Sequence, residues 1–432
     1  MKENSLNATR AALKSFLSDL VTATDLPMEE HWEYHRGEGQ SWHGSVVQEP
    51  SFGGMYGRGS MRKGAASIRE ALLKDYPEYL SALGFLNSAG ALQTDSMLLQ
   101  LAYEVFRRFG TWVPSENDIE SVLSDAAAFF DSKTVRLCLE APALNLRGPQ
   151  TVKPIKFPGG IVLRATTDED ITRFFGGSVY SASRANPLPF PDFLFSKEFE
   201  VPKVVGDLEK LKAVDVAHSH GPDLERCFLA LSTFKDAAAV GYDNIYVRPV
   251  GLVLGVAAGT QRITANEKIP FGFYDLTPEE GPKIECHARC FETLHQTLEM
   301  ACQRLVDGSR RSKARDTIVD SVIGLESILL ANIPDRGELR FRFSLNYASL
   351  FPRDERRAAF STAQDLYDIR SKIAHGVSPK TRVKIGDGDY SLDQAAKLAR
   401  GVLQRTIAFF VSNAQHPDFM AKGYWETKQL GL

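Results

Sequence analysis

Residues 365–376 read DLYDIRSKIAHG, and this stretch decides how the C-terminal third of the chain is interpreted. Its apolar residues recur at three- and four-residue spacing, which predicts an amphipathic helix over 354–375 with Gly376 as its C-terminal cap. Arg370 falls within a stripe of small and aromatic residues, so the guanidinium is expected to face the interior. Burying a guanidinium is costly unless an anion accompanies it.

A second predicted helix, over 312–331, offers that anion. Glu326 lies seven residues after Val319 and four before Leu330, on the apolar face of this helix. A carboxylate in such a position needs a positive partner, and Arg370 on a facing helix is the natural one. A structural ion pair and the anchor of an active site both fit this pattern.

The C-terminal third is expected to form a four-helix bundle. Short connections between successive long helices favour antiparallel neighbours. The long helices are predicted over 286–306, 312–331, 354–375 and 392–412, with a shorter helix over 339–350.

Two further regions precede this bundle. The first region is mainly helical, with helices over 68–83, 96–109 and 119–130 and a glycine-rich loop over 37–64. The second mixes short strands with helices, and TTDED predicts a helix starting at Thr167 because it supplies an N-cap and an acidic first turn. We therefore expect a multi-domain, α-rich chain with domains over 1–132, 133–283 and 284–432.

Composition excludes several classes of protein. Of the 432 residues, 43% are hydrophobic and 24% charged, which is typical of a globular chain rather than a disordered or fibrous one. The longest apolar run, over 250–258, is too short for a membrane span, and the N-terminus lacks the apolar core of a signal peptide. The five cysteines are odd in number and thinly spread, so reduced thiols and a cytoplasmic location are expected, with no membrane partner.

Charge is distributed unevenly along the chain. From residue 301 onward there are 21 Lys and Arg against 15 Asp and Glu, which leaves 30 basic and 39 acidic residues in the first 300. A basic C-terminal third suggests a polyanionic partner, although a solvated helical surface of mixed charge also explains it.

No metal site or other cofactor is expected. Cys286, His287, Cys290 and His295 have side chains that bind zinc, but they lie in a predicted amphipathic helix, where cysteines usually act as small core residues. The glycines of GGMYGRGS match neither phosphate-loop signature, so they are interpreted as a plain loop.

The segment from Arg370 to His375 fits the Arg-x(4–6)-His motif of HEPN domains. The flanking helices, with SVIGLESILL, FRFSLNYASLF and DLYDIRSKIAHG in this order, resemble the Apea-like HEPN branch over about residues 284–413. The resemblance implies a four-helix bundle that dimerises and acts as a metal-independent endoribonuclease, with a role in bacterial anti-phage or stress defence. The residue after the arginine departs from the common Asn, Asp or His, because it is Ser371.

The residues suit that chemistry. RNA scission without a metal needs a base for the 2′-hydroxyl, an acid for the leaving oxygen and a cation for the phosphorane. His375 can act as acid or base, Arg370 can stabilise the developing charge, and Glu326 completes the candidate catalytic set. The candidates for holding RNA are Ser371, Lys372, Lys380, Arg382 and Lys384.

Two other interpretations stay open. The bundle could be a catalytically inactive HEPN module that dimerises and binds RNA or a protein, or a purely structural bundle. In the leading hypothesis, the acidic upstream region senses an unidentified trigger or restrains the nuclease.

Helical geometry limits how Arg370 and His375 can act on one phosphate. At 100° per residue, Arg370 and His375 are about 140° apart around one helix, so they cannot easily reach one phosphate. Either the last turn unwinds before Gly376, or a second copy of the chain supplies groups across a two-fold interface.

Overall fold

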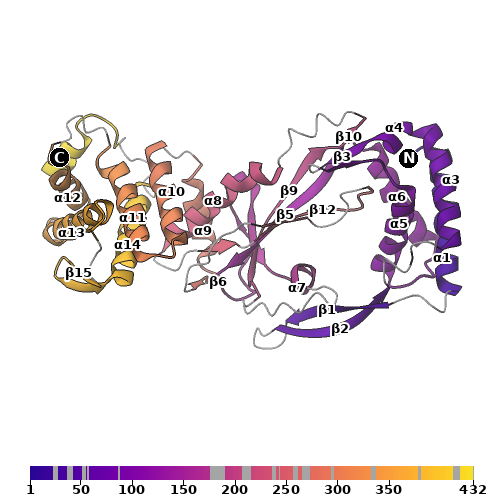
Figure 1. Cartoon of the computed structure of the whole chain (residues 1–432), viewed down its shortest axis with the longest axis horizontal. Helices are drawn as coiled ribbons and strands as arrows, with labels where there is room; N and C mark the ends of the chain where they lie inside the picture. The colour runs from indigo at the N-terminus through magenta and orange to yellow at the C-terminus, as the bar shows by residue number, and fades with distance from the viewer. Residues whose placement is uncertain are drawn as a thin grey trace. The chain divides into compact units, whose positions relative to one another are not determined.

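The protein is described here by a computed structural model of the whole chain (Figure 1). The structure describes all residues except 23–27, 37–41, 51–54, 56–57, 86–87, 176–189, 207–215, 236–239, 243, 256–260, 265–272, 293–295, 332–336, 378–380, 412–418 and 432. The described residues contain many helices and several small sheets, so the chain is α-rich but mixed.

The chain forms two compact units. The first comprises Met1–Ala141, Ala165–Gly221 and Asn244–Thr264, and the second comprises Pro142–Arg164, Pro222–Asp243 and Ala265–Leu432. The three-domain division of the sequence analysis stays a prediction.

Helices form one part of the first unit: α1 (Glu3–Thr22), α3 (Gly59–Asp75), α4 (Pro77–Ser81), α5 (Thr94–Phe109) and α6 (Glu116–Asp131). Helix α3 packs against α1 and α5. Gly64 makes this close approach possible, because a Cβ atom there would lie 3.0 Å from side-chain carbons of Ala12 and Leu98. The predicted helices over 96–109 and 119–130 are confirmed as α5 and α6.

Two expectations for this region are wrong. The helix predicted over 68–83 is divided into α3 and α4, because Pro77 has no backbone N–H with which to continue the first helix. The predicted loop over 37–64 contains β2 (Trp42–Pro50), which pairs antiparallel with β1 (Met28–Arg36). Pairing with β1 supplies the backbone hydrogen bonds that the glycine-rich sequence alone did not suggest.

Strands of a larger sheet complete the first unit. They follow the order β13 (Gln261–Thr264), β12 (Asn244–Pro249), β5 (Thr134–Leu144) and β9 (Phe193–Pro202). A smaller sheet has the order β10 (Val204–Val205), β3 (Leu83–Phe85) and β4 (Ser88–Gly90). The middle region thus has the strands expected from its sequence.

The N-cap predicted at Thr167 is confirmed. Helix α7 (Asp168–Phe175) follows it, and the backbone N–H of Asp170 donates to Oγ1 of Thr167 over 3.2 Å. The Thr167 N–H donates in return to the Asp170 carboxylate over 2.9 Å. This reciprocal pair is a capping box, and it fixes the start of α7.

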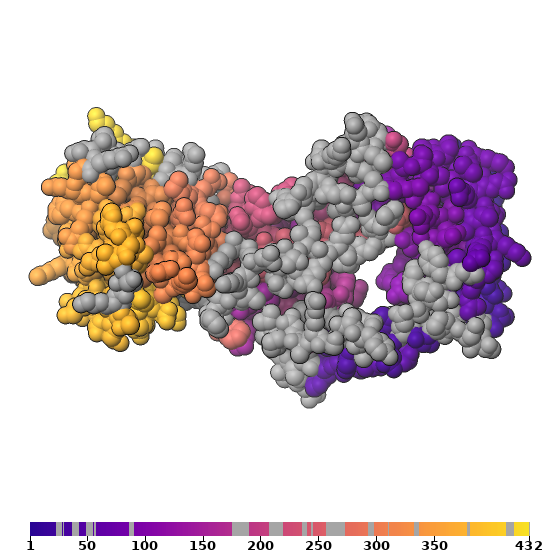
Figure 2. Space-filling model, in the orientation of Figure 1, coloured from indigo at the N-terminus to yellow at the C-terminus, as the bar shows by residue number. Residues whose placement is uncertain are grey.

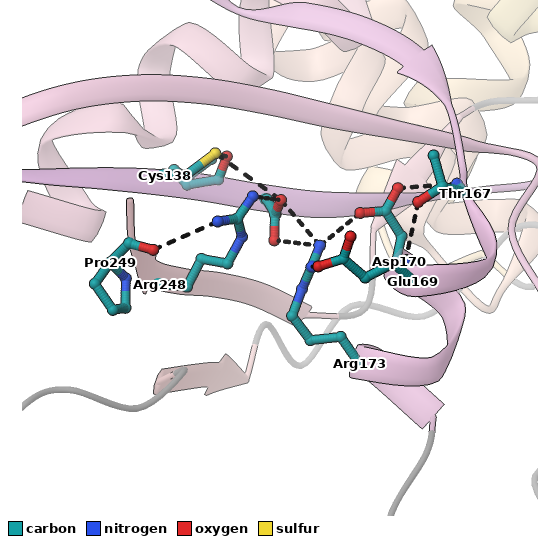
Figure 3. Close-up of polar contacts among 9 residues, drawn as sticks. Cys138, Thr167, Glu169, Asp170, Arg173, Arg248 and Pro249 are labelled. Atoms are coloured by element: carbon teal, nitrogen blue, oxygen red, sulfur yellow. Dashed lines mark hydrogen bonds and ion pairs between the residues drawn. The ribbon is translucent and has the colours of Figure 1, made fainter. Parts of the chain in front are cut away.

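A buried carboxylate connects α7 to two strands (Figure 3). Glu140 on β5 is fully enclosed, and its oxygens lie 3.1 Å from Nη2 of Arg173 and 3.1 Å from Nη2 of Arg248. Arg173 also contacts Asp170 over 2.5 Å. Two guanidinium groups and two carboxylates therefore neutralise one another inside the first unit, where an unpaired charge would be costly.

The second unit begins with short strands: β6 (Leu146–Arg147), β7 (Ile155–Lys156), β8 (Val162–Ala165), β11 (Gly241–Tyr242) and β14 (Tyr274–Asp275). A 3₁₀ turn, η2 (Pro158–Gly160), lies between β7 and β8, which pair antiparallel. Strand β14 pairs parallel with β6. Helix α8 (Val216–Phe234) crosses the boundary between the units at Pro222.

Among the described residues from 281 onward, the second unit is helical apart from one hairpin. Its helices are α9 (Gly281–Arg289), α10 (Gln296–Arg310), α11 (Ala314–Leu329), α12 (Leu339–Ser349), α13 (Arg356–Ala374), α14 (Leu392–Val411) and α15 (Tyr424–Leu430). Helix α11 packs against α10, α13 and α14, and α12 packs against α13. Figure 2 shows the residues of these helices, coloured orange to yellow, gathered in one part of the molecule. The predicted helices that became α11 to α14 agree with the structure to within two residues at each end.

The helix predicted over 286–306 is wrong as a single element. Helix α9 ends at Arg289, where the N–H groups of Cys290 and Phe291 donate to carbonyls three residues earlier. Helix α9 packs against β7, whereas α10 packs against α11. The continuous apolar periodicity over 286–306 therefore belongs to two helices that pack against different elements. The sequence also gave no sign of the hairpin β15 (Arg382–Ile385) and β16 (Gly388–Ser391).

In the part of the chain that the structure describes, no helix is both long enough and apolar enough to cross a membrane.

We expect Glu140→Gln to lower the free energy of unfolding of the first unit by about 3–5 kcal/mol, because two buried guanidinium groups would lose their carboxylate. Glu198→Gln is the matched control: its partner Arg136 is exposed, so the loss should be at most about 1 kcal/mol. Urea unfolding followed by hydrogen exchange of β5 and β12 amides measures both. Equal losses for the two variants would show that Glu140 does not hold the network.

Candidate active site

Helices α11 and α13 bring together the two charged residues that the sequence singled out. Nη2 of Arg370 donates to Oε2 of Glu326 over 2.9 Å. Both side chains are largely enclosed, with exposed fractions of 26% for Arg370 and 18% for Glu326. The predicted ion pair is therefore present, and whether it takes part in catalysis stays a prediction.

Glu326 lies at the edge of the buried face of α11 rather than on it. The fully buried apolar residues of α11 are Ile318, Val322, Leu325, Ile328 and Leu329. Val319, Ile323 and Leu330 are only half-buried, as is Glu326. This position lets the carboxylate meet α13 without becoming part of the hydrophobic core.

The charge of Arg370 compensates only in part for the burial of the Glu326 carboxylate. Burial raises the pKa of Glu326, and the positive charge of Arg370 offsets this rise only in part. Nε of Arg370 is buried and makes no hydrogen bond with any residue that the structure describes. Nε of Arg173 and Nε of Arg248 in the Glu140 network are buried and unused in the same way, so this donor does not distinguish Arg370 from a structural arginine.

Tyr367 is a neighbour of the pair that the sequence analysis did not place in the site. Its ring lies 5.3 Å from that of Phe343 on α12, centroid to centroid. Burial raises the pKa of Tyr367, and the charge of Glu326 raises it further. The only sequence signal was its spacing, three residues before Arg370 in the same stripe.

His375 is exposed at the end of the same helix. Its N–H donates to the Ser371 carbonyl over 3.0 Å, as in a regular α-helix. The Gly376 N–H donates to Ile373 and the Val377 N–H to Lys372, and Gly376 has φ 79°. These two bonds form a Schellman cap. Helix α13 therefore stays regular up to His375 in this structure, and its last turn is not unwound.

The candidate RNA-binding residues differ in their exposure and in whether they already have a charged partner. Lys372 and Lys384 are exposed, and Ser371 is half-buried. Arg382 instead forms an ion pair with Asp389 across the hairpin, with 2.9 Å between Nε and Oδ2. Lys380 lies outside the described residues. The sequence could not show that the charge of Arg382 is already neutralised within the chain.

The hairpin is fixed to the site helix. The backbone N–H of Gly386 in its turn donates to the carboxylate of Asp365 on α13 over 2.8 Å. Gly386 has φ 57°, a conformation that glycine adopts without strain. This contact holds β15, and Lys384 with it, beside α13.

The residues considered for zinc are not assembled as a metal site. Cys286 is exposed and Cys290 half-buried, while Nε2 of His287 lies 2.8 Å from the Thr233 hydroxyl. His295 lies outside the described residues. Among the residues that are described, no three His, Cys, Asp or Glu side chains are grouped to hold a metal ion.

Comparison of the chain with protein-family models, curated proteins and solved structures found no match.

Because the pKa of Glu326 is raised above its ordinary 4.5, this group stabilises the fold most when protonated, and that contribution is lost as pH rises above about 4.5. We expect the stability of the wild type relative to Glu326→Gln to fall between pH 4.5 and 7. The fall should be larger in an Arg370→Met background, which lacks the opposing charge. Urea unfolding across this range is the measurement. If the relative stability instead rises with pH, the ion pair outweighs burial and the pKa is lowered.

Proposed function

We propose that this chain is a metal-independent endoribonuclease of HEPN type that acts in the bacterial cytoplasm in anti-phage or stress defence. The observation that carries the proposal is the Glu326–Arg370 pair between α11 and α13, with His375 exposed at the end of the same α13. In this proposal the upstream residues respond to a trigger that controls the nuclease.

The three residues have distinct roles in the proposed reaction. His375 takes the proton of the 2′-hydroxyl, and O2′ then attacks the neighbouring phosphorus. Arg370 stabilises the charge that develops on the phosphorane oxygens. An imidazolium returns a proton to the leaving O5′, so the products carry a 2′,3′-cyclic phosphate and a 5′-hydroxyl. Glu326 acts as a positioning residue, because it contacts Arg370.

Restriction to RNA follows from the nucleophile, because DNA has no 2′-hydroxyl. Lys372 and Lys384 are exposed and hold flanking phosphates in this proposal. Arg382 joins them only by exchanging Asp389 for a phosphate.

The first test is cleavage of a mixed RNA substrate. His375→Ala should lower the rate by about 10²- to 10⁴-fold, because the reaction loses its acid and base. Arg370→Lys should also lower it, since a lysine keeps a charge opposite Glu326 but lacks the planar fork. Arg357→Ala, an exposed position at the other end of α13, is the control and should cut at the wild-type rate. The readout is the rate and the chemistry of the product ends, with and without EDTA.

Wild-type activity should persist in EDTA. A His375→Ala protein that cuts as fast as the wild type would remove the catalytic assignment. Activity lost in EDTA and restored by zinc or magnesium would replace it with a metal mechanism.

The active unit is proposed to be a dimer. With α13 regular up to His375, this residue and Arg370 are about 140° apart and cannot easily meet one phosphate within one chain. A two-fold axis near the end of α13 brings both copies of each residue to one groove. One histidine can then act as the base while the other acts as the acid.

Mixing wild type with an excess of Arg370→Lys/His375→Ala protein, after subunit exchange, should suppress cleavage well beyond dilution, since most sites would contain an inactive half. Arg357→Ala protein in the same excess should leave cleavage undiminished, because the mixed dimers keep all four site residues. Suppression in proportion to dilution, together with a monomer in sedimentation, would exclude the shared site.

A catalytically inactive HEPN module for binding RNA or a protein is the second candidate. It is favoured by Ser371 after the motif arginine. Dimerisation and RNA binding without cleavage in the first test would select it.

A further inference from the structure

The second unit contains a pocket that none of the candidate active-site residues line. It has a volume of about 920 Å³ and lies where α15 and the residues before it meet α12. Pockets for small ligands commonly have about 300–1,000 Å³. Neither Arg370 nor His375 lines it, so the pocket is distinct from the proposed cleavage site.

One wall of the pocket is held rigidly. Asn346 is 1% exposed, and its Nδ2 donates to the Leu329 carbonyl at the end of α11 over 2.7 Å. Gln429 on α15 donates to Oδ1 of Asn346 over 2.6 Å. Asn346 thus fixes α15 relative to α11 and α12. Binding to a pocket whose side chains are already ordered costs little conformational entropy.

Aromatic side chains supply flat surfaces in this pocket. Phe341 on α12 is 49% exposed, which is high for a phenylalanine, although its ring contacts Phe360 on α13 with 5.8 Å between centroids. Trp425 on α15 also lines the pocket and is buried. A phenylalanine that is anchored at one edge and exposed elsewhere is suited to stacking with a flat ligand.

The polar lining carries both signs of charge. Glu338 and Glu426 provide carboxylates, and Arg342 and Lys422 provide cations. A purely apolar ligand would desolvate the exposed charges of Glu338, Glu426 and Lys422. A simple anion would face two carboxylates, and a simple cation would face an arginine and a lysine.

We propose that this pocket binds a nucleotide. A nucleotide combines a flat aromatic base for Phe341, base N–H donors for Glu338 and Glu426, and a phosphate for Lys422. Two sources share this chemistry: a free nucleotide, or one unstacked nucleotide of a bound RNA strand.

The experiment measures binding to the wild-type chain by calorimetry. The probes are AMP, GMP and a 2′-O-methyl RNA pentamer, which lacks the nucleophile and cannot be cleaved. Phe341→Ala and Lys422→Ala, both at exposed positions, should each weaken binding at least about fivefold, as expected for the loss of a stacking ring or a phosphate contact. The matched controls are Met300→Ala and Lys397→Ala, which are exposed positions on α10 and α14 outside the pocket and should bind as the wild type does.

Binding of AMP or GMP with these effects supports a free nucleotide as the ligand. Binding of the pentamer alone, with the same effects, supports an RNA strand. The proposal is overturned if no probe binds, or if binding is unchanged in Phe341→Ala and Lys422→Ala. It is also overturned if Arg370→Lys weakens binding of AMP or GMP as much as these variants do, because the nucleotide would then occupy the other site. None of these outcomes depends on whether the chain cleaves RNA.

Discussion

The contact between Glu326 and Arg370 is the interaction on which the arrangement of the C-terminal helices depends. Each residue would be costly to enclose alone, so α11 and α13 have to present them to one another. The buried side chains of Ala363, Leu366 and Ile369 set the rotation of α13 that this contact requires and, with it, the direction in which His375 leaves the last turn. A HEPN-type site would therefore be a consequence of how two helices satisfy two charges.

The contacts of Glu140 and Glu326 with arginine differ in the exposure of the carboxylate and in the number of arginine partners. Glu140 is fully enclosed and contacts two arginines, and one of them also contacts Asp170. Glu326 contacts a single arginine, is 18% exposed, and has a pKa that burial raises. Both arrangements leave an arginine Nε buried and unused, so the difference lies in the carboxylate: that of Glu140 is fully enclosed, whereas that of Glu326 borders solvent.

The pocket proposed to bind a nucleotide and the Glu326 site are connected through the end of α11. Asn346 accepts from α15 and donates to the Leu329 carbonyl, and the Leu330 N–H donates to the carbonyl of Glu326. A ligand that shifted α15 would therefore act on the helix turn that carries Glu326. This chain of hydrogen bonds gives the second unit a physical route between the proposed ligand and the proposed reaction.

The sequence by itself determined the local elements. Apolar periodicity predicted α11 to α14, TTDED predicted the start of α7, and Gly376 predicted the end of α13, because each of these signals acts within a few residues. It also predicted the partner of Glu326, since a buried carboxylate leaves few choices. Tertiary structure alone decided the division into α9 and α10, the pairing of β1 with β2, and the neutralisation of Arg382 by Asp389. The pocket between α12 and α15 belongs to the same group. These features depend on which segments meet in space, and the spacing of residues along one helix or strand carries no record of that.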